Sequence, residues 1–600
     1  MKKFSSFLFF IAFSSIAYST TYYVDGINGS DSNVGTSWGA AVKTIDQAQT
    51  LATANPGVDV VYIKGGVGDI TTNTVWTLTA VTENFYGSFE GWESAPDQRP
   101  MKDNDGNGII EPWEFKYPTT YKANYNNTAI NGSAYILDGF TITHTSTKSS
   151  AMTTLISPIG GTVQNCVFTG CNLTYTNIGT DIGGCLIKTV GTFKNNLIEK
   201  NTVTVTETAD CKIVPILEIN PAATGTVPTV SINGCVFRNN TTSITFSAAA
   251  VNPTKLYFII NVSGSALTTS VTISNCLIHN NDASYSGSIN YPTSPNSGIV
   301  GSTNGSGSYT SDSYINCLFA NNKLTNLGAC LYVKSNTYVT HKVYNTVFWN
   351  NQNNGAAVSM ASSSKQTATS VISNNYMDAT TTGTWTGTAG FVYTENHIDL
   401  NSSNTGTNAP VFKTPTSAIG YTNDGTVEKS VWCITSGSYL FGKGITTIST
   451  TDKAEVKFAT SPAVGAYEYA YFQSNVTGNW NSGPTWQTSP DNSTWSTTSS
   501  NPSRTYAAGI NILNGNTITV TDNAIASVLN LNSGGELTVN GGKQFTVLSG
   551  LTNNGTLNLK SDVTGTATIL TPTTISGSGS TNVQQYLTGG RNWYISSPVS

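Results

Sequence analysis

The stretch Ile273-Ser-Asn-Cys276-Leu-Ile278-His-Asn-Asn281 decides the fold because the chain repeats it. Related copies occupy residues 163–168, 193–198, 232–240, 314–322 and 343–351. Their central residues are separated by 30, 39, 41, 41 and 29 positions, and they are Cys166, Asn196, Cys235, Cys276, Cys317 and Thr346. A unit that recurs every ~20–50 residues and cannot bury its own apolar side indicates a solenoid.

The copies read as strands and not as helices. They are short and rich in Val, Ile, Phe, Thr and Asn, without the i, i+3, i+4 apolar spacing of a helix. We therefore predict an all-β chain that forms a right-handed parallel β-helix, in which each coil is stabilised by its neighbours. The repeated Cys and Asn positions would stack in one column, where asparagine amides can both donate and accept hydrogen bonds.

Composition excludes several partners. Only 10% of the 600 residues are charged, the net charge is −5, and the arginines are Arg99, Arg238, Arg504 and Arg591. A nucleic-acid partner or an anionic membrane surface is therefore not expected. Such a polar but weakly charged chain suits stacked strands and tight turns.

The first residues are typical of a signal peptide. Two lysines precede an apolar run at residues 7–16, and small residues lead to Ser19. We assign residues 1–19 to a signal peptide and expect a secreted or cell-surface, outer-membrane-associated protein. The run is too short for a membrane span, and no other stretch is long and apolar enough to cross a bilayer.

Nine cysteines in an exported chain raise the question of disulfides. Four of them share the repeated position, which favours buried thiols that pack as small apolar groups. Disulfides stay open for Cys171, Cys211 or Cys433. Cys276 and His279 have Cys-x-x-His spacing, but no second ligand pair accompanies them, so a zinc site is not expected.

An N-terminal cap is expected before the coils. Thr44 and Gln47 have the spacing of a capping box, and Asn55-Pro-Gly57 would end the helix that follows. A solenoid needs such a cap because its first coil has an open edge.

Three phrases carry a resemblance to known proteins. Tyr22-Tyr-Val-Asp-Gly26 and Leu137-Asp-Gly-Phe-Thr-Ile142 resemble the opening of exported pectate-lyase-like β-helix proteins, and Ser461-Pro-Ala-Val-Gly-Ala-Tyr-Glu-Tyr469 is similar to the closing segment of surface β-helix proteins common in the Bacteroidetes. The resemblance covers roughly residues 21–470. It implies export and the fold, whereas the group mixes lyases, adhesins and proteins of unknown role.

These observations divide the chain. Residues 20–470 are predicted to form the β-helix with its cap and an inserted loop at about 95–120. Residues 471–585 contain short alternating strand phrases and resemble a smaller stacked-strand module that follows such helices. Residues 586–600 look like the start of a further module, so we expect the natural chain to continue.

Residues 103–114 match a calcium-binding loop at every specified position. The expected Ca²⁺ ligands are Asp103, Asp105, Asn107, the Ile109 carbonyl, Glu111 and Glu114. Gly108 permits the sharp turn, and Ile110 would hold the loop to what lies beneath. Nearby prolines leave no room for flanking helices, so the loop resembles an isolated dockerin-type or EF-type site with a structural role.

The same pattern could also be an acidic surface turn without an ion. We expect calcium to order residues 95–120.

No catalytic residues are assigned. A β-helix lyase needs a basic side chain, but the basic residues of the coils fall at scattered positions where solvated turn residues are expected: Lys194, Lys212, Arg238, His279, Lys334 and His341. The Asp-Asp, Gly-His-Gly and Arg-Ile-Lys phrases of polygalacturonase-type glycosidases are absent from the sequence. Neither reading yields a set of groups that converge on one groove.

A binding role is easier to support. A long face of Asn, Thr, Ser and Tyr offers hydrogen-bonding groups, and Trp480, Trp486 and Trp495 could stack on sugars, although large aromatics more often lie in a core. We predict an exported adhesive or glycan-contacting scaffold whose partner is a polysaccharide or a cell-surface glycan. A polysaccharide lyase acting on a uronate-containing polymer is the alternative.

Overall fold

A computed structural model gives the fold of the chain. Described are residues 19–589 apart from 56, 67–69, 73–75, 79–82, 124–129, 133–135, 145–155, 160, 177–185, 190, 208–211, 214–215, 220–229, 247–254, 265–269, 287–296, 305–310, 326–328, 336–339, 353–357, 363–369, 379–383, 387–392, 397–398, 402–408, 448 and 572–574. Residues 1–18 of the predicted signal peptide and residues 590–600 of the predicted further module therefore lie outside the described residues.

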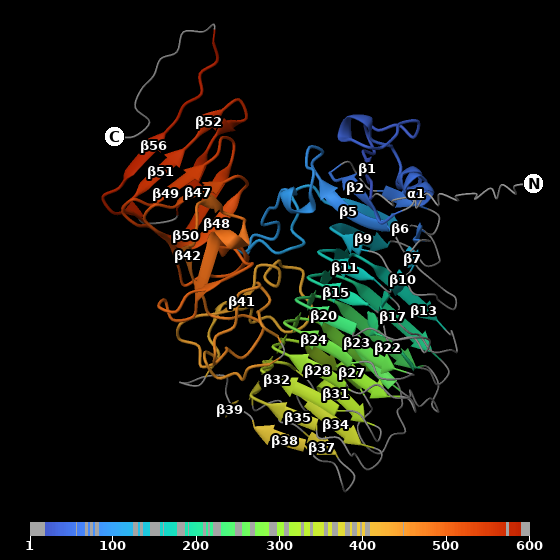
Figure 1. Ribbon diagram of the computed structural model, residues 1–600. Helices are drawn as coiled ribbons and strands as arrows, with labels where there is room; N and C mark the ends of the chain where they lie inside the picture. Colours follow the sequence, from blue (N-terminus) through green and yellow to red (C-terminus); the bar gives the residue numbers. More distant parts are fainter. Residues whose placement is uncertain are drawn as a thin grey trace, which may run out of the picture.

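The repeated phrases form a parallel β-helix, as the sequence predicts (Figure 1). Each full coil passes in chain order through four parallel sheets, here called sheets 1 to 4. Sheet 1 pairs twelve strands in this order: β1 (Thr21–Val24), β2 (Asp59–Lys64), β5 (Glu83–Phe89), β8 (Ile136–Asp138), β11 (Thr162–Gln164), β15 (Thr192–Lys194), β20 (Val230–Asn233), β24 (Ser270–Ser274), β28 (Ser311–Ile315), β32 (Thr340–Tyr344), β35 (Ser370–Ser373) and β38 (Tyr393–Asn396).

Sheets 2 and 3 follow sheet 1 in each coil. Sheet 2 contains β3 (Ile70–Thr72), β6 (Thr119–Ala123), β9 (Phe140–His144), β12 (Val167–Thr169), β16 (Leu197–Glu199), β21 (Val236–Arg238), β25 (Leu277–His279), β29 (Leu318–Ala320), β33 (Val347–Trp349), β36 (Tyr376–Asp378) and β39 (Asp399–Asn401). Sheet 3 contains β13 (Asn172–Thr176), β17 (Thr202–Glu207), β22 (Thr241–Phe246), β26 (Asp282–Ser286) and β30 (Lys323–Thr325).

Sheet 4 closes each coil. It contains β4 (Trp76–Leu78), β7 (Ile130–Gly132), β10 (Ile156–Ile159), β14 (Ile187–Thr189), β18 (Lys212–Ile213), β19 (Leu217–Ile219), β23 (Lys255–Gly264), β27 (Ser297–Asn304), β31 (Ala329–Ser335), β34 (Val358–Ser362) and β37 (Thr384–Thr386). Val, Ile, Leu and Phe side chains from the four sheets fill the interior, and many of them are fully buried.

The predicted column of small residues exists at the turn from sheet 1 to sheet 2. Its six residues, from Cys166 to Thr346, are all fully buried. Strand pairing places each one above the next, because the N–H that follows each residue donates to the carbonyl of its equivalent in the preceding coil, at 2.8–2.9 Å. The seven cysteines among the described residues are buried and form no disulfide with one another, as the repeat predicted for four of them. Cys185 and Cys211 lie outside the described residues.

A second column, at the turn from sheet 2 to sheet 3, is an asparagine ladder. Asn240 Nδ2 donates to Asn281 Oδ1 at 2.9 Å, and Asn281 Nδ2 donates to Asn322 Oδ1 at 3.0 Å. Asn201 and Asn351 continue the ladder at either end. Because each amide also donates to a backbone carbonyl of the preceding coil, these buried polar groups are satisfied within the chain.

The residue before each position of the two columns makes a turn. Asn275, Asn280, Asn316 and Asn321 adopt φ values of 53–55°, a left-handed conformation that asparagine tolerates better than most residues. The turn points their side chains outward. The first asparagine of an Asn-Asn pair therefore makes the turn, and the second faces the interior.

The outward asparagines hold residues 409–470, here called the covering segment, against sheet 2. Asn280 Nδ2 donates to Ala418 O at 2.6 Å, and Asn345 Nδ2 donates to Ile445 O at 2.8 Å. The covering segment contains the antiparallel strands β40 (Phe412–Thr414) and β41 (Val431–Ile434). Its apolar residues share one buried cluster with outward residues of sheet 2.

The N-terminal cap contains helix α1 (Ile45–Ala54) and the short 3-10 helix η1 (Trp38–Ala40). Thr44 caps α1 by accepting a hydrogen bond from Gln47 N, as predicted. The reciprocal half of the capping box is replaced, because the Thr44 N–H donates to the Asp31 carboxylate.

Residues 471–583 form a second stack of mostly parallel strands (Figure 1). One sheet contains β42 (Tyr471–Ser474), β44 (Trp486–Ser489), β45 (Ser496–Thr497), β46 (Gly509–Ile512), β48 (Ala524–Leu531), β50 (Gln544–Asn553), β54 (Thr568–Leu570) and β55 (Ile575–Ser576). The other contains β43 (Gly478–Asn479), β47 (Thr517–Val520), β49 (Glu536–Val539), β51 (Thr556–Leu559) and β56 (Ser580–Val583), and β52 (Ser561–Asp562) pairs with β53 (Gly565–Thr566). The 3-10 helices η4 (Gly483–Thr485) and η5 (Pro502–Arg504) precede the longer strands. We call residues 471–583 the C-terminal stack.

Candidate metal centre

The acidic loop, residues 103–114, leaves the β-helix at the turn between β5 and β6. The 3-10 helix η2 (Pro96–Gln98) precedes it. A short antiparallel bridge between Met101 and Phe115 closes its base, and Lys102 N donates to Glu114 O at 2.9 Å. Apart from the three-residue η2, no helix flanks the loop among the described residues, in agreement with the prolines of the sequence.

The first half of the loop is folded around the Asp103 carboxylate. Gly106 N donates to Asp103 Oδ1 at 2.7 Å, and Gly108 N donates to Asp103 Oδ2 at 3.0 Å. Gly106 and Gly108 have φ values of 75° and 84°, which suit glycine. These bonds turn the following side chains toward Asp103.

Carboxylates gather inside the turn. Oxygens of Asp103, Asp105 and Glu114 lie within 4.8 Å of one another. Burial and the nearby Glu111 carboxylate raise the pKa of Asp105 to about 7. The same causes, burial first, hold the pKa of Glu114 well above its usual range. Carboxylates with such pKa values are poised to exchange protons for a cation.

The Glu111 side chain is a second indication that the loop can hold a cation. This side chain is only 8% exposed, and its Oε2 atom is buried with no hydrogen-bond partner. Its other oxygen accepts only a long hydrogen bond from Asn107 Nδ2, at 3.4 Å. A buried carboxylate oxygen without a partner is costly, and an oxygen-binding cation such as Ca²⁺ would satisfy it.

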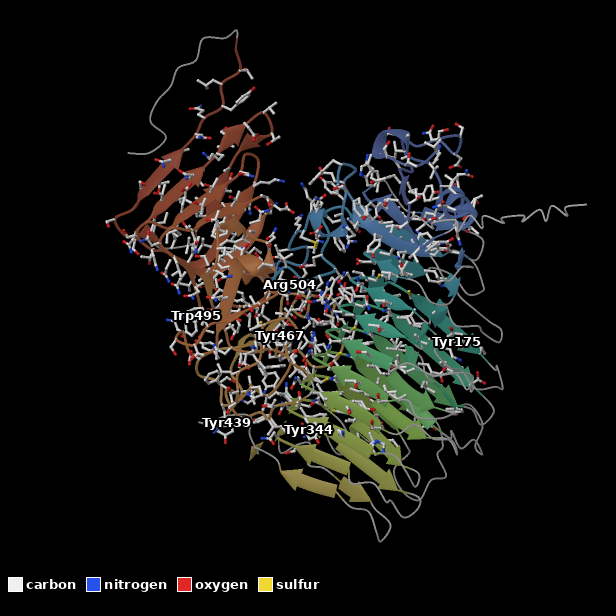
Figure 2. The ribbon with its side chains drawn as sticks, in the orientation of Figure 1. Tyr175, Tyr344, Tyr439, Tyr467, Trp495 and Arg504 are labelled. Atoms are coloured by element: carbon white, nitrogen blue, oxygen red, sulfur yellow. The ribbon has the colours of Figure 1, made fainter. Side chains whose placement is uncertain are left out.

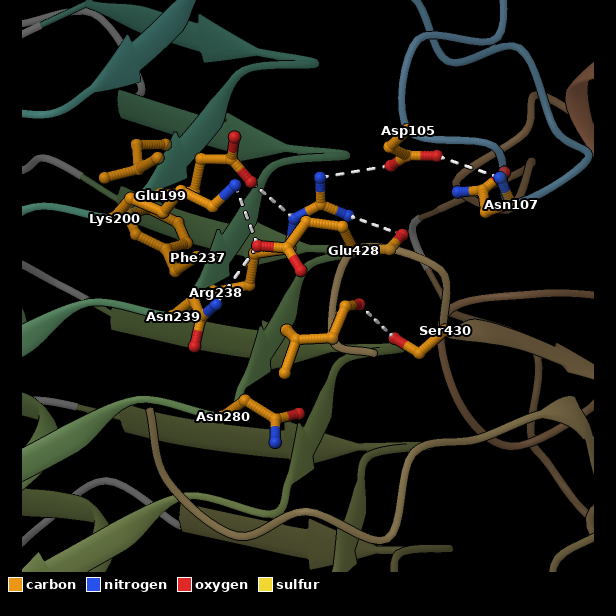
Figure 3. Close-up of polar contacts among 12 residues, drawn as sticks. Asp105, Asn107, Glu199, Lys200, Phe237, Arg238, Asn239, Asn280, Glu428 and Ser430 are labelled. Atoms are coloured by element: carbon orange, nitrogen blue, oxygen red, sulfur yellow. Dashed lines mark hydrogen bonds and ion pairs between the residues drawn. The ribbon is translucent and has the colours of Figure 1, made fainter. Parts of the chain in front are cut away.

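Arg238 connects the acidic loop to the coils (Figure 3). Its guanidinium lies 3.1 Å from Asp105 Oδ2 and 2.8 Å from Glu199 Oε2, and Nη1 donates to Glu428 O at 3.3 Å. The side chain is 6% exposed, and the three contacts belong to the loop, to sheet 2 and to the covering segment. Arg238 therefore holds three parts of the chain together.

A second buried cation faces the loop. Lys453 Nζ lies 4.7 Å from the centre of the Trp113 ring. Its charge interacts with the Glu111 carboxylate, whereas Arg238 is shared between Asp105 and Glu199. The carboxylates around the loop therefore outnumber the cations beside them, which suits a divalent cation.

The far side of the loop contacts the C-terminal stack. Ile110 N donates to Ser503 O at 2.8 Å, and Met101 N donates to Asp522 Oδ2 at 2.9 Å. Figure 1 shows this segment reaching from the first coils to the C-terminal stack. Ile110 is buried as predicted, and Ile109, expected only to offer its carbonyl, is buried as well. The loop thus bridges two bodies of strands.

Among the predicted ligands, the structure brings the carboxylates of Asp103, Asp105 and Glu114 together, with Asn107 and Glu111 beside them. The side chain of Asn107 is partly engaged, because its Oδ1 accepts from Ile109 N at 2.7 Å. The sequence pattern did not reveal Arg238 or Lys453, since both are distant in sequence and no local motif contains them.

For several basic residues the predicted solvated position is wrong. Arg238 and His279 are buried beneath the covering segment, and His341 is buried beside Asp312 inside the coils, so none of the three is a solvated turn residue. Burial lowers the pKa of His279 to about 3. The side chains of Lys212 and Lys334 lie outside the described residues. Lys194 is 40% exposed and pairs with Glu455.

Two of the three tryptophans considered for sugar stacking are core residues. Trp480 and Trp486 are fully buried in the C-terminal stack, and their indole N–H groups donate to Ser503 Oγ and Trp480 O. Trp495 is half-buried. Trp480 and Trp486 therefore stabilise strands and do not face a ligand.

Comparison with known proteins gives fold-level likenesses only. No protein-family model matches the sequence, and no curated protein matches it. A crystal structure of pectate lyase Pel9A aligns with 76% of this chain and 97% of its own, at 14% identity and a TM-score of 0.31. A rhamnogalacturonan lyase aligns with 65% of this chain and 88% of its own, at 14% identity and a TM-score of 0.20. Neither TM-score reaches 0.5, so the parallel β-helix rests on the strand pairing described above.

Proposed function

We propose that this protein is an exported, surface-associated β-helix scaffold that contacts glycans without cleaving them, of the kind common in the Bacteroidetes, and that a structural calcium ion occupies its acidic loop. No helix among the described residues has the length and apolar character that a bilayer crossing demands. The Ca²⁺ ligands would be Asp103, Asp105, Asn107, the Ile109 carbonyl, Glu111 and Glu114. The ion would neutralise the buried carboxylates and hold the loop between the coils and the C-terminal stack.

The observation that carries glycan contact is a regular array of hydroxyl groups on sheet 3. Strand register aligns Thr174, Thr204, Ser243, Ser284 and Thr325 in one row. A second row contains Thr176, Thr206, Thr245 and Ser286. The members of both rows are half-buried or exposed, and they alternate with buried residues. Rungs ~4.8 Å apart repeat the same groups over five coils.

The array suits an extended polymer rich in hydroxyl groups. Each Thr or Ser both donates and accepts hydrogen bonds, and the nearest charges, Asp282 and Lys323, offset each other 3.7 Å apart. A neutral, periodic face of this kind matches neutral sugars better than nucleic acid. Single hydroxyl contacts are weak, so affinity would come from repetition along the chain.

The coils offer little support for a lyase. Arg238 and His279 lie under the covering segment and His341 lies inside the coils, so these basic groups cannot reach a polymer. A lyase acting on a uronate-containing polymer is the alternative that experiment must separate.

A glycan array probed with the mature protein tests the proposal, beside a variant carrying Thr204→Lys and Ser243→Lys. The matched control is Ser496→Lys and Thr497→Lys on the C-terminal stack. We expect at least a tenfold loss of glycan binding in the sheet 3 variant only. Release of an unsaturated uronate product, followed by absorbance in the presence of calcium, would contradict the proposal.

A further inference from the structure

A cavity of about 330 Å³ lies where the coils, the acidic loop, the covering segment and the C-terminal stack meet. Gln164, Asn165, Lys194 and Asn195 border it from the first turn of two adjacent coils. Asn481, Asn501, Ser503 and Arg504 border it from the C-terminal stack. Figure 2 shows Arg504 at this junction. The volume is near the ~300 Å³ at which small-ligand sites begin.

Asn195 is the first sign that the cavity takes a ligand. It belongs to the row of outward asparagines whose other members hold the covering segment or a neighbouring side chain. Asn195 is 5% exposed, yet its side-chain amide has no hydrogen bond to any other described residue. The next coil has Gly234 at this position, and a Cβ there would lie 2.3 Å from Asn195 Oδ1. Gly234 thus leaves room for the Asn195 amide, which has no hydrogen bond to a described residue.

A second group on the wall has unused hydrogen-bonding capacity. Arg504 Nη1 lies 3.4 Å from Glu455 Oε2, whereas Arg504 Nη2 is buried and has no partner. A guanidinium donor and an amide that both donates and accepts suit a ligand whose groups also do both, as hydroxyls do.

The charges and the apolar residues of the cavity wall further restrict the chemical class of the ligand. Each lysine and arginine that borders the cavity already contacts a carboxylate, because Lys194 and Arg504 share Glu455. Arg99 is already paired with Asp138 at 2.8 Å, and Lys194 with Glu455 at 3.2 Å. Met101, Ile110 and Phe115 supply apolar surface, on which the C–H face of a sugar ring can pack. A free anion would find no unpaired lysine or arginine head here.

We propose that this junction cavity binds the end of a neutral oligosaccharide, with Asn195 and Arg504 as specificity-determining residues. The inference rests on the proposed function, because it names a second contact for the same class of ligand. The cavity lies at the first turn, whereas the hydroxyl array lies beyond the second turn. The two sites can therefore be tested separately.

Isothermal titration of the mature protein with cellotriose, mannotriose, maltotriose and trigalacturonate provides the test. Asn195→Gly removes the amide and suits the φ of 52°, as Gly234 does in the next coil. Arg504→Gln removes the guanidinium. Asn492→Gly, at an exposed turn with φ 58°, is the control, and thermal unfolding verifies that every variant is folded.

We expect at least one neutral trisaccharide to bind, with a Kd at least tenfold higher in both cavity variants and unchanged in Asn492→Gly. Neutral binding that persists in both cavity variants would overturn the cavity while leaving glycan contact intact. A preference for trigalacturonate would overturn the neutral ligand. If no glycan binds in the titration or on the array, the cavity and the proposed function fail together.

Discussion

The repeated coils and the acidic loop bury polar groups in opposite ways. In the coils, neutral amides form a ladder in which each donor and acceptor finds a partner inside the chain. In the loop, the four carboxylates of Asp103, Asp105, Glu111 and Glu114 lie together with two cations beside them, and one buried oxygen has no partner. The difference teaches that the amide ladder is satisfied within the chain, whereas the loop leaves a buried carboxylate oxygen for which we propose a calcium ion from solution.

Arg238→Met should break the connection between the two regions. Removing the guanidinium leaves Glu199 and Asp105 buried without their cation, which costs on the order of 3–5 kcal/mol. We expect that loss in the free energy of unfolding measured with denaturant. Lys200→Met removes the ion pair between a 46% exposed lysine and the largely buried Glu428, which keeps a hydrogen bond from Asn239 Nδ2, and should cost on the order of 1 kcal/mol. Equal losses in both variants would argue against a special role for Arg238.

Asn281→Ala should interrupt the ladder at its centre. The change removes the acceptor of one Asn240 amide hydrogen and the side-chain donor to the backbone carbonyl of Phe237, at a cost of about 2–4 kcal/mol. Ser284→Ala, on the outer face of the same coil, is the matched control. A loss in Asn281→Ala no larger than in Ser284→Ala would show that the ladder contributes little.

Calcium removal should act on the loop and spare the coils. For a Kd of ~10⁻⁴ M, 10 mM calcium stabilises the occupied state by about 2.7 kcal/mol. Chelation should therefore speed hydrogen exchange in residues 101–116 and in the facing part of η5, while the sheet 1 and sheet 2 strands of the central coils keep their protection. Asp491→Asn, in an exposed turn, should respond to chelation as the unmodified chain does. Uniform loss of protection across the coils would contradict the comparison.

The covering segment buries polar groups in a third way, because its buried carboxylates accept hydrogen bonds from backbone N–H groups. Burial raises the pKa of Asp452 to about 7 and that of Glu468 to about 7. Because these folded-state values exceed those of the unfolded chain, the stabilisation is present at low pH and is lost as pH rises toward 7. We expect a loss of about 1 kcal/mol per group for each pH unit between about 5 and 7.

Hydrogen exchange in residues 452–468, corrected for intrinsic rates, measures that loss. Asp452→Asn with Glu468→Gln should flatten the profile. An unchanged profile in this double variant would assign the pH dependence to other groups.

Local patterns account for what the sequence could predict. The spacing of the Cys and Asn positions predicted the coils and the inner column, because side-chain periodicity and turn chemistry are local properties. The capping residue Thr44 was predicted for the same reason, although Asp31 replaced Gln47 as its second partner. The order of acidic residues in the loop likewise identified which carboxylates would meet.

Long-range packing accounts for what the sequence could not predict. Arg238 and His279 look like solvated turn residues until Glu428 and Trp432 of the covering segment, 190 and 153 positions later in the chain, lie against them. Asn239, Asn280 and Asn321 make the turn and hold that segment, which no periodicity reveals. Asn195 is distinguished from its equivalents only by the residues that surround it in space.

Calcium titration of the metal-free mature protein tests the central claim most directly, with Asp103→Ala and Glu114→Ala beside it. The account predicts one ion per chain, bound by the unmodified protein and lost in both variants, while their coils keep the circular dichroism of the unmodified chain. Equal calcium uptake by the unmodified protein and the two variants would contradict the account.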